Sequence, residues 1–189
     1  LLRGPSSLSR AEHELIAAFV SPRNECVFCS NSHAAVSRFH YGADSILVDQ
    51  VLDDVESAPV SAKLRALLRI AAKVRGDARQ VQASDVEAAR NEGADDKAIH
   101  DTVLIAAAFC MFNRYVDGLA TVAPADQESY ARIGEQLGTS GYVDSVRPDP
   151  ARNRQTVLFA AGGRSAARRR LPLPSPVLAP SHHPPRLRP

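Results

Sequence analysis

Apolar residues recur every three or four positions along most of residues 9–137, which is the spacing of amphipathic α-helices. The segment that Ser61 opens is the clearest example. Its apolar face consists of Leu64, Leu67, Leu68, Ala71 and Ala72. No segment shows the sustained alternation that a half-buried β-strand requires. We therefore predict an all-α fold, a compact domain of about six to seven helices.

Capping signals and helix breakers set the predicted bounds of these helices. Ser9-Arg10-Ala11-Glu12 is a capping box that opens the first helix, and Pro22 is expected to end it. Ser84-Asp85-Val86-Glu87 is a second capping box, opening a helix that ends at Gly93. The other predicted helices run from Cys26 to Phe39, from Ser45 to Asp54, from Ser61 onward, from Asp96 to Leu119 and from Gln127 to Leu137.

The longest predicted helix, Asp96 to Leu119, has a centre that is apolar on nearly every side, from Val103 to Phe112. A helix that is hydrophobic all round is usually buried. We therefore predict that this segment is the buried axis of the domain. Cys110 within it is expected to be a small buried hydrophobe.

The composition of the chain changes after residue 146. Residues 147–189 contain nine Arg and one Asp, and seven Pro follow from Pro172 onward, whereas residues 1–146 contain 14 Lys and Arg against 20 Asp and Glu. Such a tail cannot bury enough apolar surface to offset its ordering entropy. We predict a helical domain over residues 1–146 and a disordered, basic tail over residues 147–189, and we do not expect a nucleic-acid partner.

Cysteine usage and the absence of a targeting segment point to a cytoplasmic protein. Cys26, Cys29 and Cys110 do not form the paired framework of a small secreted domain. No signal peptide opens the chain, and no run of about 18 apolar residues could span a membrane. Residue 1 is Leu rather than Met, so we expect the domain to be truncated at its N-terminus.

The candidate chemistry lies in one run, Glu14-x11-Cys26-x2-Cys29-x3-His33. The helix predicted from Cys26 places both thiols near a helix N-terminus, where unpaired amides favour a thiolate. His33 follows Cys29 by four residues and shares its face, so the imidazole can accept the thiol proton while Glu14 orients it. Cys26 and Cys29 are also close enough to form a disulfide after a modest local adjustment. This combination is typical of thiol enzymes that reduce hydroperoxides.

Other interpretations of the run stay open, among them an accidental Cys-x-x-Cys pair in a buried helix, which the presence of His33 and Glu14 argues against. Cys26, Cys29 and His33 also have the spacing of zinc ligands, with Glu14 as a fourth, although structural zinc sites usually pair two such clusters. A redox-sensing or zinc-binding interaction protein would use the same residues without catalysis. Thioredoxin-like chemistry would need a βαβ context, which the helical pattern does not provide. No cofactor is expected.

Further positions carry weaker expectations. His13 and His40 are expected at the surface beside helix ends, and His100 has no evident partner. Phe28 and Phe109 are expected to line an apolar pocket that admits organic hydroperoxides. A polar cluster in the long helix is expected to serve packing or a subunit contact; its members are Asn113, Arg114 and Asp117.

The run and its surroundings resemble the alkylhydroperoxidase D-like branch of the carboxymuconolactone decarboxylase superfamily. Leu8-Ser9-Arg10-Ala11-Glu12-His13-Glu14-Leu15-Ile16 precedes the thiols, and Asn31-Ser32-His33-Ala34-Ala35 follows them. Phe112-Asn113-Arg114-Tyr115-Val116-Asp117-Gly118-Leu119 is similar to the long-helix signature of the peroxidase-related members. The resemblance covers residues 1–146, and the best-known members carry a His where this chain has Phe28.

This resemblance implies an all-helical fold that assembles into trimers or hexamers. It implies that Cys29 is the peroxidatic thiol, that Cys26 is the resolving thiol, and that His33 and Glu14 form the proton relay. The implied partners are an organic hydroperoxide and a dithiol reductant, such as a lipoylated or thioredoxin-like protein. The superfamily also includes decarboxylases, an alternative function in which the thiol pair would have no use.

Overall fold

The computed structural model describes residues 1–144, and the side chains of residues 1–142. All regular secondary structure in this part of the chain is helical, which confirms the predicted all-α fold. The helices are α1 (Arg10–Arg23), α2 (Val27–Tyr41), η1 (Gly42–Asp44), α3 (Ile46–Asp53), α4 (Ala62–Asp77), η2 (Ala78–Gln80), α5 (Ala83–Asn91), α6 (Asp96–Gly118) and α7 (Gln127–Asp144). The predicted basic tail, residues 147–189, lies outside the described residues, so its disorder and the domain boundary at residue 146 stay predictions.

The capping box at the start of α1 forms as predicted. The Ser9 amide donates to Glu12 Oε2 at 2.7 Å, and the Glu12 amide donates to Ser9 Oγ at 3.2 Å. Pro22 does not end the helix, because α1 continues to Arg23. A proline in the last turn removes a single backbone donor, which a helix end tolerates better than its middle does.

The second predicted capping box was wrong in its register. Gln82 is the N-cap of α5, and its amide donates to Asp85 Oδ2 at 2.8 Å. Lys73 of α4 donates to both oxygens of Asp85, at 2.6 and 2.7 Å. This contact from a neighbouring helix holds the Asp85 carboxylate at the start of α5, so the helix begins before Ser84 rather than at it.

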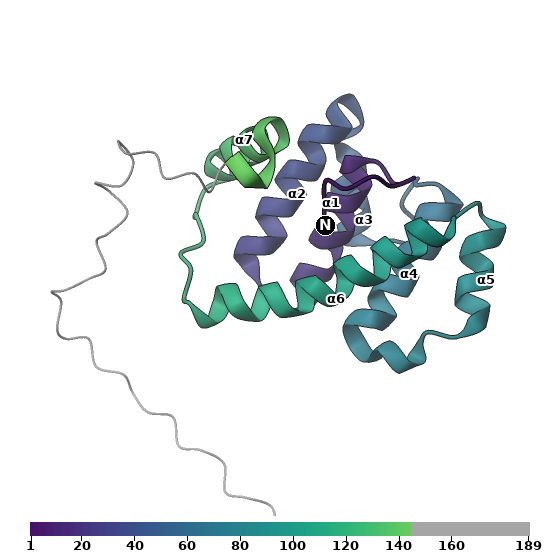
Figure 1. Ribbon diagram of the computed structural model, residues 1–189. Coiled ribbons are helices and arrows are strands. Elements are labelled where there is room, and N and C mark those ends of the chain that lie inside the picture. The colour runs from purple at the N-terminus through teal and green to yellow at the C-terminus, as the bar shows by residue number, and fades with distance from the viewer. Residues whose placement is uncertain (145–189) are drawn as a thin grey trace, which may run out of the picture. The chain divides into compact units, whose positions relative to one another are not determined.

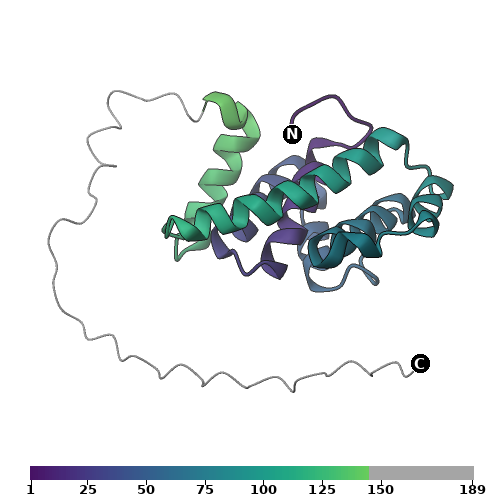
Figure 2. The same cartoon turned by 60° about the horizontal axis from the view of Figure 1, so that its bottom comes forward.

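The buried axis of the domain is α1, and the prediction that α6 has this role was wrong. Every residue of α1 from Ala11 to Ser21 except Glu12 is buried. In Figure 1, α2 and α7 lie on one side of α1, and α4 and α5 lie on the other. Figure 2 shows α6 running across the front of these helices.

Only one face of α6 is buried, because the helix lies at the outside of the bundle. Ile105, Ala106 and Phe109 pack inward with exposures of 3% or less, whereas Leu104 is 45% and Met111 is 58% exposed. The face of α6 that is exposed to solvent is apolar. A fully buried helix would have the same apolar residues all round, so the sequence pattern alone does not distinguish the two cases. No helix in the described part of the chain is long and apolar enough to cross a membrane.

Helix α7 approaches α2 closely through two glycines one turn apart. A Cβ at Gly134 would lie 2.7 Å from the carbonyl oxygen of Ala35, and one at Gly138 would clash with the ring of Phe39. α7 also continues beyond its predicted end at Leu137, although the backbone of Gly141 (φ 70°, ψ −167°) interrupts the helical geometry. The two glycines thus bring the end of α7, including Tyr142, towards the centre of the bundle.

Replacing Gly134 with alanine is expected to destabilise the fold by about 1–3 kcal/mol, because the methyl group would meet backbone rather than a flexible side chain. Urea unfolding measures the effect. Gly76→Ala is the matched control, since Gly76 is an exposed helical glycine with no atom within 4 Å of its added Cβ. That substitution should instead stabilise α4 by roughly 0.5–1 kcal/mol. Equal effects at both positions would contradict the close approach of α7.

His13 is buried, so its predicted surface position was wrong. Its side chain is 2% exposed, and Nε2 lies 3.8 Å from Asp101 Oδ2 of α6. Leu2 and Leu8, in the segment before α1, are also buried and belong to the hydrophobic core. Burial lowers the pKa of His13, and the nearby Asp101 carboxylate offsets only part of this effect. His40 is half-buried, and burial lowers its pKa too.

The free energy of unfolding is expected to fall as the pH drops below about 6.5, the pKa of an unperturbed histidine. Because the pKa of His13 is lower in the folded protein, the unfolded chain binds the proton first as the pH falls. The contribution of neutral, buried His13 to stability is therefore fully present above about pH 6.5 and is lost as the pH falls towards the folded pKa of His13. Burial raises the pKa of Asp101, but hydrogen bonds from Lys97, Ser6 and His100 and the charge of Lys97 outweigh this effect and hold the pKa at about 2. Asp101 therefore does not titrate between about pH 5.5 and about pH 7.5.

Urea unfolding at about pH 7.5 and about pH 5.5 tests this expectation, with His13→Gln compared against His100→Gln. The side chain of His100 is 65% exposed, so its removal should leave the pH dependence in place. His13→Gln should reduce that dependence. If the free energy of unfolding of His13→Gln depends on pH as strongly as that of the wild type, His13 is not the source of the pH dependence.

Candidate active site

The turn between α1 and α2 places the two neighbouring thiols. Glu25 adopts a positive φ of 63°, which is uncommon for a residue other than glycine. The amide of Cys26 then donates back to the Ser21 carbonyl at 3.2 Å, so the chain reverses within a few residues. Cys26 becomes the N-cap of α2, and Cys29 lies in its first turn. The two thiols are free, buried and close to each other.

The end of α6 is joined to this turn by a small polar network. Asn24 Nδ2 donates to Asn113 Oδ1 at 2.8 Å, and Asn113 Nδ2 donates to Ser21 Oγ at 3.1 Å. Cys110 is half-buried rather than fully buried, and its sulfur lies 3.7 Å from Asn24 Nδ2. Asn113 therefore joins α6 to this turn, whereas Arg114 and Asp117 are exposed, so the packing or subunit role expected of the cluster stays a prediction.

Cys26 is strongly biased towards its protonated form. Burial is the main cause, and the Cys29 thiol and the Asp117 carboxylate add to it, so that together they raise the pKa of Cys26 to about 12. The amide of Cys29 opposes this shift without cancelling it. A thiol in this state is a poor first nucleophile at neutral pH, because only the thiolate attacks.

The structure brings Glu14 and His33 together, as their positions in the run suggest. His33 Nδ1 lies 2.7 Å from Glu14 Oε2, and Glu14 is fully buried in α1. His33 lies one turn after Cys29 on α2, and the Phe109 ring of α6 packs edge-on against its imidazole with centroids 4.5 Å apart. A buried carboxylate paired with an imidazole that follows a thiol by one helical turn is suited to a proton relay.

Two further residues complete the surroundings of Glu14, and neither was predicted from the sequence. Arg3 Nη1 donates to Glu14 Oε1 at 2.6 Å. The Tyr142 hydroxyl donates to the same carboxylate, at 2.9 Å from Oε1 and 3.0 Å from Oε2, and lies 3.2 Å from His33 Nδ1. Arg3 precedes the first capping box and Tyr142 follows the predicted end of the last helix, so no periodic signal could have identified them.

These contacts keep Glu14 ionised despite its burial. Burial alone would raise the pKa of this carboxyl, but the hydrogen bond and charge of His33 and the Arg3 guanidinium outweigh it, so the net shift is downward. The carboxylate is therefore available at neutral pH as an acceptor for the imidazole.

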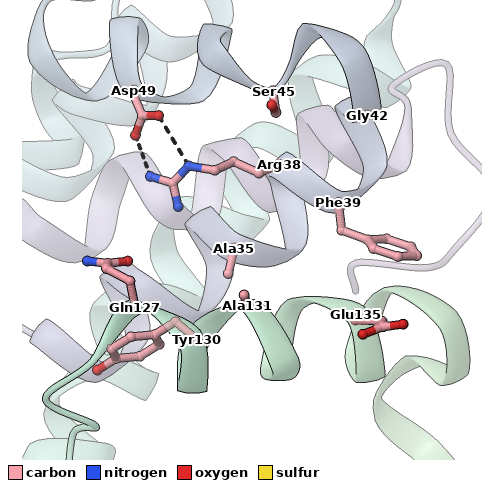
Figure 3. A pocket seen from close by; sticks show the side chains of 10 residues that line it. All are labelled: Ala35, Arg38, Phe39, Gly42, Ser45, Asp49, Gln127, Tyr130, Ala131 and Glu135. Carbon is pink, nitrogen blue, oxygen red and sulfur yellow. Dashed lines mark hydrogen bonds and ion pairs between the residues drawn. The ribbon is translucent and has the colours of Figure 1, made fainter.

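Of the two predicted pocket residues, Phe109 lies at the site through its contact with His33, and Phe28 is half-buried in the first turn of α2. A separate groove of about 680 Å³ lies between α2, the start of α3 and α7. Figure 3 shows Arg38, Phe39 and Tyr130 among its lining residues. Neither thiol lines this groove, so the predicted apolar pocket beside Cys29 stays a prediction.

The described residues contain no group of three His, Cys, Asp or Glu side chains arranged to hold a metal ion. In the candidate site, the carboxylate that could have been a fourth zinc ligand is instead occupied by Arg3, His33 and Tyr142. The geometry of the described chain thus gives the zinc interpretation no support.

The chain is similar in fold to several solved structures, among them two peroxidase-related proteins. One is the alkylhydroperoxidase AhpD core of an uncharacterized peroxidase-related protein from Ralstonia eutropha JMP134, with a TM-score of 0.64 and 27% identity, covering 71% of this chain and 68% of that one. The other is an uncharacterized peroxidase-related protein from Silicibacter sp. TM1040, with a TM-score of 0.61 and 31% identity, covering 69% of this chain and 66% of that one. No protein-family model and no curated protein matches the chain.

Proposed function

We propose that this chain, which has the alkylhydroperoxidase AhpD-like fold of those two structures, is a thiol-dependent peroxidase that reduces organic hydroperoxides. The observation that carries the proposal is the 2.7 Å contact between buried Glu14 and His33, one helical turn from a pair of neighbouring thiols. The peroxidase-related names of the two neighbours support the same class of enzyme.

In the first step, His33 takes the proton of the Cys29 thiol, and the resulting thiolate attacks the terminal oxygen of the hydroperoxide. The S–O bond forms while the O–O bond breaks. Cys29 is thereby oxidised to a sulfenic acid, and the alkoxide leaves with the O–O electron pair. His33 returns the proton to the alkoxide, which departs as an alcohol. Glu14 stabilises the transient imidazolium through Nδ1.

In the second step, Cys26 attacks the sulfur of the Cys29 sulfenic acid. A disulfide forms, and the hydroxyl group leaves as water after taking up the proton of the Cys26 thiol. An external dithiol then reduces the disulfide by exchange and becomes a disulfide itself. The balanced reaction converts one hydroperoxide and one dithiol into an alcohol, water and one disulfide.

The proposal extends to the partners and the location of the protein. The reductant is a protein dithiol, lipoylated or thioredoxin-like, and a reducing cytoplasm would maintain it. The protein assembles as a homo-oligomer, a trimer or hexamer. The exposed apolar side of α6 supports this assembly, since Leu104, Met111 and Phe112 are each at least 40% exposed.

A thiol count on the reduced protein tests the proposal. One equivalent of an organic hydroperoxide should remove two of the three thiols, and a small dithiol should restore them. The Cys29→Ser variant should lose none. If all three thiols survive in well-folded wild-type protein, the chain is not a peroxidase of this kind.

A further inference from the structure

The carboxylate of Glu14 is held by donors from three distant parts of the chain. Arg3 comes from the segment before α1, His33 from α2 and Tyr142 from the end of α7. Oε1 accepts from Arg3 and Tyr142, and Oε2 accepts from His33 and Tyr142. Both oxygens are therefore occupied, and the carboxylate cannot turn without breaking several charge-assisted hydrogen bonds.

The occupied carboxylate decides which nitrogen of His33 carries the proton. An ionised carboxylate only accepts hydrogen bonds, so a neutral His33 must place its proton on Nδ1 to bond Glu14 at 2.7 Å. Its Nε2 is then an acceptor on the opposite side of the ring. The Tyr142 hydroxyl, 3.2 Å from Nδ1, keeps its own proton because burial and the Glu14 charge raise the pKa of Tyr142.

We propose that Tyr142 and Arg3 are positioning residues of the proton relay: they fix Glu14 so that His33 stays protonated at Nδ1 and keeps Nε2 free to accept the proton of Cys29. This inference rests on the proposed function for its catalytic consequence, but the tautomer of His33 can be observed without any reaction. Tyr142 and Arg3 act on the relay through Glu14.

The chain places Tyr142 by a specific local geometry. The non-helical backbone of Gly141 turns the end of α7, and the Tyr142 ring then stacks on His33 with centroids 6.0 Å apart. The Arg3 guanidinium lies 5.2 Å from the centre of the same ring. Arg3 Nη2 also donates to the Leu137 carbonyl of α7 at 3.4 Å. Arg3 therefore supports both the carboxylate and the tyrosine that binds it.

Nitrogen NMR of the reduced protein, without peroxide, tests the positioning directly, because the two ring nitrogens of His33 report the tautomer. Wild-type protein should show the tautomer protonated at Nδ1. Tyr142→Phe, which removes only the hydroxyl, should show a mixture of tautomers. Tyr130→Phe is the matched control: Tyr130 is also a buried tyrosine of α7, and its hydroxyl has no partner in the described structure. It should retain the wild-type signal.

The reaction of these variants with an organic hydroperoxide gives the second readout. Tyr142→Phe should react about 10- to 100-fold more slowly than wild type, as expected when a catalytic group is misplaced, and Tyr130→Phe should react at the wild-type rate. Arg3→Gln should behave like Tyr142→Phe, whereas Arg3→Lys should restore part of the rate by keeping the charge. If Tyr142→Phe fails to fold, the comparison of Arg3→Gln with Arg3→Lys still tests whether the donors to Glu14 position His33.

A wild-type tautomer in folded Tyr142→Phe and Arg3→Gln would overturn the inference, even if both variants were less stable. A wild-type protein that does not react with hydroperoxide would instead contradict the proposed function, and the NMR comparison would still decide whether Tyr142 and Arg3 position His33. The two failures are thus distinguishable.

Discussion

Replacing Cys29 with serine is expected to slow the reaction with an organic hydroperoxide by a factor on the order of 10³ or more, as when a nucleophile is removed from other enzymes. A serine hydroxyl stays protonated at neutral pH and cannot replace the thiolate. Cys26→Ser should instead react once and stop, because no neighbouring thiol remains to condense with the sulfenic acid of Cys29.

Peroxide consumption measured without a reductant, with mass spectrometry of the trapped sulfenic acid, separates these outcomes. Cys110→Ser is the control, since Cys110 is the remaining thiol and lies half-buried on α6. It should consume peroxide like the wild type. A Cys29→Ser protein with wild-type consumption would refute the mechanism. Activity in Cys29→Ser but not in Cys26→Ser would reverse the two roles.

Replacing Glu14 with alanine is expected to lower the free energy of unfolding by about 3–5 kcal/mol, the cost of removing one partner from a buried ion pair. The change would leave Arg3, His33 and Tyr142 without their shared acceptor inside the protein. The Arg3 side chain is 22% exposed and can regain some hydration, which favours the lower end of this range.

Urea unfolding at neutral pH measures this loss, and Glu12→Ala is a control on the same helix. Glu12 closes the capping box with Ser9 near the surface, so its removal should cost only about 1 kcal/mol. Glu14→Gln keeps the volume and should retain more stability than Glu14→Ala. If Glu14→Ala costs no more than Glu12→Ala, the buried carboxylate is not the structural centre that its contacts indicate.

The parts of the site that were predictable depend on short separations along the chain. Ser9 caps α1, and Cys26 and Cys29 open α2, because capping and turn chemistry act over a few residues. His33 lies one turn after Cys29, since helical spacing alone places them on one face. Glu14 and His33 lie further apart along the chain. Their contact was nevertheless predictable, because a carboxylate commonly pairs with an imidazole.

The predictions that were wrong for His13 and α6 concern burial, which depends on the residues that pack over a side chain in the folded protein. His13 was expected at the surface because it lies near a helix start, but Asp101 of α6 lies beside it, and the buried residues Leu2 and Leu8 of the segment before α1 carry no periodic signal. α6 was expected at the centre because its outer face is apolar. In the described structure α1 takes that place, and Leu104 and Met111 remain exposed.

By itself, the sequence determined the helical class and the starts of most helices, because periodicity and capping are local properties. It also indicated the four residues of the candidate relay through their spacing and residue types. Only the tertiary structure decided that Arg3 and Tyr142 enclose Glu14. These residues are 11 and 128 positions away from it along the chain. They meet because the glycines of α7 let that helix pack closely on α2, and because an ionised carboxylate buried in α1 must be satisfied by donors from wherever the fold supplies them.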